Sequence, residues 1–93
     1  MAKLTDAVRF QLSQLVQQKR NLQQEISRVR EDKKRQIAQI NNGIKYTKDK
    51  NQKASLRNQK TRVNEQCESR INSIRYQIQG VENQTRSIRS RGW

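Results

Sequence analysis

The sequence predicts an all-α fold: a long antiparallel helical hairpin, in effect a coiled coil, that dimerises into a four-helix bundle. Three observations lead to this. The 93 residues include no proline and only three glycines, so few positions interrupt a helix. Apolar residues recur three and four apart along two long segments, as on one face of an α-helix. Between them, Ile44–Leu56 lapses from this pattern and accumulates positive charge, as expected for the turn of a hairpin.

The overall composition is strongly polar. Hydrophobic residues make up 30% of the chain, charged residues 31%, and the net charge is +13. These values are typical of disordered chains. The regular spacing of the apolar residues instead indicates helices with one apolar face and one solvent-exposed face. No apolar run is long enough to span a membrane, and the N-terminus lacks the apolar core of a signal peptide. We therefore expect a single helical-hairpin domain, residues 1–93, in an intracellular, cytoplasmic protein.

The first helix is predicted over residues 5–46. Thr5 or Asp6 can cap its first turn through a side-chain oxygen. The apolar positions from Val8 to Val29 follow a heptad, in which Lys19 and Lys33 occupy two of the a positions. After Val29 the apolar positions shift by four residues relative to this heptad. Such a shift locally unwinds a left-handed supercoil.

The end of the first helix is less obvious. Asn41–Gly43 is a typical helix end, but Ile44 continues the apolar stripe, so we set the end near residue 46. A basic tip follows at residues 47–52, and the second helix is predicted over residues 53–90. Gly80 within it costs about 1 kcal/mol relative to alanine.

The two apolar stripes are expected to face each other in one seam. One register pairs Val29 with Ile71 and sets Lys33 opposite Cys67. The alternative register would set Lys33 against Lys60, so the first is favoured. The predicted seam consists of Val8, Leu12, Leu15, Leu22, Ile26, Val29, Ile40, Ile44, Leu56, Val63, Cys67, Ile71, Ile74, Ile78, Val81 and Ile88.

A two-helix rod with so thin a seam is only marginally stable by itself. Dimerisation into a four-helix bundle would bury more apolar surface, so we expect self-association. Four apolar residues lie off the seam and could line a second interface: Phe10, Val16, Ile37 and Tyr76. The alternative is that they are ordinary scattered surface hydrophobes.

The sequence offers little that could support catalysis. It contains no histidine and a single cysteine, so the usual general base and the usual zinc-ligand sets are missing. No glycine-rich phosphate loop is present. Cys67 falls on the apolar stripe, where a free cysteine acts as a small hydrophobe. The carboxylates of Glu31, Asp32, Glu65 and Glu68 have arginine neighbours, which suits surface ion pairs. The sequence therefore predicts no enzyme, no cofactor and no metal site.

Positive charge is concentrated in residues 28–62, which we call the basic segment. Its net charge is +9, against +4 for the rest of the chain. Such a potential attracts polyanions, and phosphate neutralisation with counterion release supplies affinity independent of sequence. The candidate anion or nucleic-acid contacts are Arg28, Arg30, Lys33, Lys34, Arg35, Lys45, Lys48, Lys50, Lys53, Arg57, Lys60 and Arg62.

The first helix is also rich in uncharged amides, at Gln11, Gln14, Gln17, Gln18, Gln23, Gln24, Gln36 and Gln39. An amide-rich face can hydrogen-bond a partner at a lower desolvation cost than a charged one. The simpler interpretation is solubility with adequate helix propensity.

Three functional hypotheses follow from these patterns. The leading one is a non-catalytic scaffold or adaptor that binds a protein partner or a larger assembly and docks its basic tip on an anionic surface. The alternative is a nucleic-acid-binding protein in which the tip and Arg86, Arg89 and Arg91 contact the RNA or DNA backbone. With one aromatic residue near the tip, Tyr46, recognition of bases is poorly supported. A third is a chain that folds only within a larger assembly.

Overall fold

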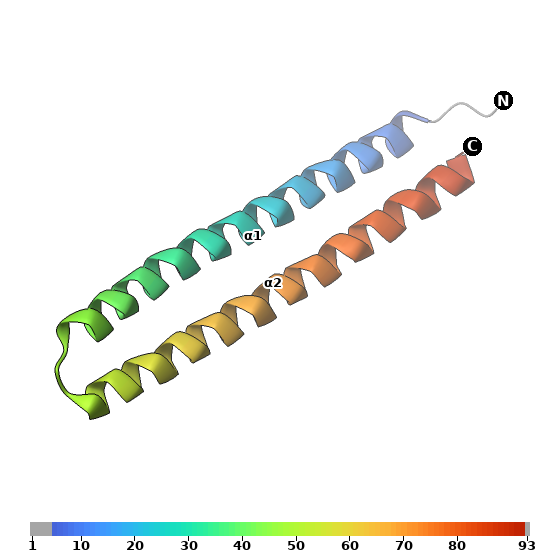
Figure 1. Cartoon of the computed structure of the whole chain (residues 1–93). Coiled ribbons are helices and arrows are strands. Elements are labelled where there is room, and N and C mark those ends of the chain that lie inside the picture. The colour runs from blue at the N-terminus through green and yellow to red at the C-terminus, as the bar shows by residue number, and fades with distance from the viewer. Residues whose placement is uncertain (1–4, 93) are drawn as a thin grey trace. The chain divides into compact units, whose positions relative to one another are not determined.

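The computed structural model describes residues 5–92 and is an all-α helical hairpin, as predicted (Figure 1). Helix α1 spans Asp6–Tyr46 and helix α2 spans Lys50–Gly92. A loop of residues 47–49 joins them, and the described part of the chain contains no β-strand. Neither of these helices has a stretch long and apolar enough to cross a membrane.

The chain divides into two compact units. Unit 1 combines Met1–Glu25 with Ser73–Trp93, and unit 2 is the continuous segment Ile26–Asn72. In each unit, a segment of α1 lies beside an antiparallel segment of α2 (Figure 1). Unit 1 thus contains the beginning of α1 and the end of α2, while unit 2 contains the connecting loop.

The first turn of α1 is capped by Thr5, one of the two residues predicted for this role. The Thr5 hydroxyl accepts a hydrogen bond from the Val8 N–H at 3.2 Å, and the Thr5 carbonyl accepts one from the Arg9 N–H at 3.0 Å. Asp6 lies in the first turn, where its negative charge interacts favourably with the helix dipole. Thr5 therefore satisfies a backbone donor that has no partner within the helix.

Helix α1 continues through Asn41–Gly43 and ends at Tyr46. Gly43 has a negative φ, so it does not adopt the left-handed conformation that ends many helices. A Cβ at Gly43 would lie 3.2 Å from Leu56 Cδ1. The side chain of Leu56 therefore packs against Gly43, in the space next to where a larger side chain at this position would lie.

Helix α2 begins at Lys50, three residues before the predicted start at 53. Asp49 explains the difference, because its carboxylate accepts the Asn51 N–H at 2.9 Å and so caps the helix. The Thr47 hydroxyl donates to Gln52 Oε1 at 2.6 Å and accepts the Asp49 N–H at 3.4 Å. These bonds connect the loop to the first turn of α2.

All sixteen predicted seam residues are buried or half-buried. Ile37, which was predicted to lie off the seam, is also half-buried. The slip in the heptad accounts for this, because it brings Ile37 and Ile40 to the same side of α1. Phe10, Val16 and Tyr76 are exposed, at 64%, 43% and 79%.

The core is thin even where it is best packed. The buried apolar residues are Leu15, Ile26, Val29, Ile71 and Ile74, with 3–9% of their surface exposed. No side chain in residues 5–91 is fully enclosed. Packing along one seam therefore provides most of the apolar burial available to this fold.

Two lysines at seam positions form ion pairs across the helices. In unit 1, Lys19 Nζ lies 3.2 Å from Glu82 Oε1, and in unit 2, Lys33 Nζ lies 3.5 Å from Glu68 Oε1. Glu68 directly follows Cys67, the residue predicted to lie opposite Lys33. The ion pair thus matches the favoured register, and a polar group at a seam position helps to specify that register.

Candidate anion-binding surface

All twelve basic residues of the basic segment lie in unit 2. Helix α1 carries six, α2 carries five, and the loop between the helices carries Lys48. Nine of the twelve are exposed, while Lys33, Lys53 and Lys60 are half-buried at the seam. A lysine can cover apolar surface with its aliphatic stem while its ammonium group reaches water. The exposed nine are therefore the cations most accessible to an anionic ligand.

Carboxylates compensate little of this charge. Lys33 pairs with Glu68, but none of the other eleven has a carboxylate oxygen within 4.0 Å among residues 5–92. Asp49 lies in the middle of the basic segment, where its carboxylate caps α2. The positive charges therefore add to one another over this surface and attract anions.

One aromatic side chain accompanies the basic residues. Tyr46, the last residue of α1, is 76% exposed. The ammonium group of Lys45 lies 5.7 Å from the centre of its ring, within the range of a cation–π interaction. A single exposed ring can stack on one base or one other planar group, whereas proteins that bind single strands by stacking use several.

Cys67 is half-buried at the seam of unit 2 and forms no disulfide. Within the described residues, no three His, Cys, Asp or Glu side chains come together as metal ligands would. The same part of the chain contains no buried side-chain nitrogen or oxygen that lacks a hydrogen-bond partner.

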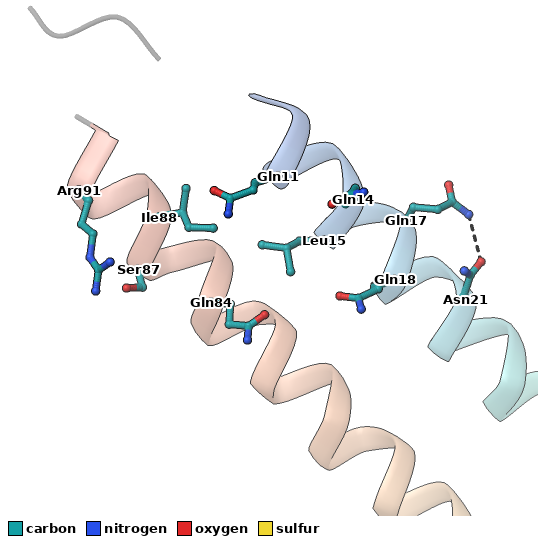
Figure 2. A pocket seen from close by; sticks show the side chains of 10 residues that line it. All are labelled: Gln11, Gln14, Leu15, Gln17, Gln18, Asn21, Gln84, Ser87, Ile88 and Arg91. Atoms are coloured by element: carbon teal, nitrogen blue, oxygen red, sulfur yellow. Dashed lines mark hydrogen bonds between the residues drawn. The ribbon is translucent and has the colours of Figure 1, made fainter. Parts of the chain in front are cut away.

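Each unit also contains a groove lined by amides, which sequence reasoning did not find. In unit 1, a groove of about 640 Å³ lies over Leu15 and Ile88. Figure 2 shows Gln11 and Gln18 of α1 and Gln84 of α2 extending toward the space between the helices. Its other lining residues are Gln14, Gln17, Asn21, Ser87 and Arg91.

The groove of unit 2 is smaller and similar in composition. It has a volume of about 350 Å³ and lies over Ile40 and Val63. Four glutamines and one arginine complete its lining: Gln36, Gln39, Gln59, Gln66 and Arg62. The glutamine spacing in α1 was a partial signal for both grooves, but the residues of α2 that complete them are far away in sequence.

No protein-family model matches this chain, and neither a curated protein nor a solved structure shows significant similarity to it. Any function assigned to the chain therefore rests on the chemistry of its own side chains.

Proposed function

We propose that this protein is a non-catalytic helical adaptor that docks on an anionic surface through its basic segment. The observation that carries the proposal is the set of nine exposed cations of the basic segment, none of which has a carboxylate within ion-pair distance in residues 5–92. A solvated helix surface usually mixes both signs of charge. The uncompensated excess favours a polyanionic partner.

The arrangement of these cations suits many weak contacts rather than one specific pocket. They are distributed over two helices and a loop, and each side chain is long and exposed. Lysines and arginines arranged in this way neutralise backbone phosphates or surface carboxylates and release counterions. The binding should therefore depend steeply on salt and little on sequence.

An adaptor also needs a second surface. Protein partners, including a second copy of the chain, would bind the remaining helical faces, because the thin core leaves apolar and amide groups available for association. This part of the proposal agrees with the self-association expected from the sequence.

The test is fluorescence anisotropy with three labelled probes: a mixed-sequence RNA, a mixed-sequence DNA duplex and polyglutamate. Each is titrated with the full chain over a series of salt concentrations. We expect log K to fall linearly with log salt, by about 0.9 per phosphate contact on duplex DNA and about 0.7 on a single strand. Absence of binding to all three at 50 mM salt would refute the proposal.

Two variants with equal net charge locate the contacts. Each replaces four exposed basic residues with glutamine and so lowers the net charge from +13 to +9. The test variant changes Lys45, Lys48, Lys50 and Arg57 in unit 2, and the control changes Arg9, Arg20, Arg75 and Arg86 in unit 1. We expect the test variant to lose far more affinity and salt dependence than the control. Equal losses would mean that net charge alone, and not the basic segment, attracts the probe.

The probes and circular dichroism also distinguish the other hypotheses. A clear preference for RNA or DNA over polyglutamate would favour the nucleic-acid-binding alternative. A preference for polyglutamate would favour an acidic protein partner. A chain that is unfolded alone and becomes helical only with a partner would favour folding within a larger assembly.

A further inference from the structure

The two sides of unit 2 differ in charge, and the groove identifies which residues belong to each side. Every long polar residue that lines this groove directly precedes a seam residue, as Gln36 precedes Ile37 and Gln59 precedes Lys60. Residues that directly precede seam residues in α1 and α2 therefore share one side, which we call the groove side. Residues that directly follow seam residues point about 100° to the other side of the seam, so they share the opposite side.

The side opposite the groove carries five exposed cations, and we call it the basic face. In α1, three of them directly follow seam residues and are spaced by four and eleven residues, about one and three helical turns. In α2, Arg57 directly follows Leu56, and Lys50 lies about two turns before Arg57. The basic face consists of Arg30, Lys34, Lys45, Lys50 and Arg57.

Negative charge is scarce on the basic face. Glu68 also directly follows a seam residue, but its carboxylate pairs with Lys33. Glu31 and Glu65 lie two residues after seam residues, so they point outward, about 200° from the seam. The groove side, in contrast, carries Asp32 together with three arginines. Positive charge is therefore less compensated on the basic face than on the groove side.

We propose that the basic face binds the phosphate backbone of a nucleic-acid duplex. This inference rests on the proposed anion docking, and it names the side of unit 2 and the partner. Contacts from lysine and arginine to phosphates give a duplex-binding protein affinity that does not depend on base sequence. From Arg30 to Lys45 the basic face extends over about 22 Å of helix, at about 1.5 Å per residue. A duplex presents one negative charge per about 1.7 Å of its axis, so each cation of the face can reach a phosphate.

The side chains on the basic face match a duplex better than other polyanions. Within residues 26–72, all of which the structure describes, Tyr46 is the one large apolar side chain that is exposed. Tyr46 directly precedes the half-buried Thr47, so it lies on the groove side. The basic face thus has no ring on which the bases of a single strand could stack. It also has no apolar anchor of the kind that protein interfaces and membrane surfaces bind, whereas the backbone of a duplex requires neither feature.

Fluorescence anisotropy of the full chain tests the partner with four labelled probes. They are a short DNA duplex, an RNA duplex of the same sequence, a single strand with the same number of phosphates, and polyglutamate of the same charge. We expect both duplexes to bind with similar affinity, and at least tenfold more tightly than the single strand or polyglutamate. Five contacts at about 0.9 each should make log K for the DNA duplex fall by about 4.5 per unit of log salt.

Two variants with equal net charge test whether one side of unit 2 makes the contacts. Each replaces three exposed residues of the basic segment and lowers the net charge from +13 to +10. The test variant, on the basic face, is Arg30→Gln, Lys34→Gln and Arg57→Gln. The control variant, off the basic face, is Arg28→Gln, Arg35→Gln and Arg62→Gln.

The two variants should differ in both affinity and salt dependence. The test variant keeps two cations of the basic face, so it should bind the DNA duplex at least tenfold more weakly, with a salt slope of about 1.8. The control should stay within about threefold of the wild type, because charges that make no contact act only through screened attraction. Circular dichroism establishes that both variants keep their helices, since glutamine has a helix propensity close to those of arginine and lysine.

Each contrary result contradicts a different part of the reasoning. Equal losses in the two variants would overturn the basic face but leave the anion docking of the basic segment in place. Tighter binding of the single strand or of polyglutamate would overturn the duplex as the partner. A tenfold preference for one duplex over the other would show contacts beyond the phosphates, which the basic face does not provide. Absence of binding to all four probes would refute the proposed function itself.

Discussion

The thin seam makes stability unusually sensitive to its few buried residues, and Ile71→Ala tests this directly. Ile71 lies in unit 2 with 3% of its surface exposed. Truncation to alanine removes three carbons, worth about 2.4 kcal/mol at about 0.8 kcal/mol per buried CH₂. The cavity adds to this cost, but a seam with water on both sides can partly collapse. We therefore expect a loss of about 3 kcal/mol, within the range of about 2–5 kcal/mol for such changes.

The measurement is urea unfolding followed by circular dichroism at one fixed protein concentration, because self-association makes apparent stability depend on concentration. Tyr76→Ala is the matched control on the same helix, since Tyr76 is 79% exposed. It should change the free energy of unfolding by less than about 0.5 kcal/mol. A similarly small change for Ile71→Ala, or an equally large loss for Tyr76→Ala, would refute the single-seam packing.

Two further predictions concern the polar groups that set the ends and register of the helices. Asp49→Ala removes the cap of α2 and should cost about 1 kcal/mol in urea unfolding, whereas Asp49→Asn should retain most of the stability; equal losses would contradict the capping role. A double-mutant cycle on Lys33 and Glu68 should give a coupling of about 0.5 kcal/mol, because Glu68 is 58% exposed and surface pairs are weak. The coupling should decrease as salt is added, and no coupling at low salt would mean that the pair does not help to specify the register.

The fold class and much of the seam could be predicted because they depend on local periodicity. Apolar residues three and four apart must share one side of a helix, and no proline interrupts either segment. The favoured register followed from avoiding Lys33 against Lys60, and the Lys33–Glu68 ion pair is consistent with it. The start of α2 was placed too late because several polar residues near the turn could cap a helix. Asp49 is identified as the cap by its hydrogen bond to Asn51.

The candidate sites depended more on tertiary structure. The sequence located the excess of positive charge, but packing determined that Lys53 and Lys60 are half-buried at the seam while their basic neighbours are exposed.

The amide-lined groove of unit 1 required both helices, since Gln14 and Gln84 are 70 residues apart in the chain and line one groove only after the hairpin closes. The sequence by itself therefore determined which residues share a side of each helix, because that follows from the helical repeat. Tertiary structure decided which sides meet and which groups remain exposed, because these depend on contacts between residues distant in sequence.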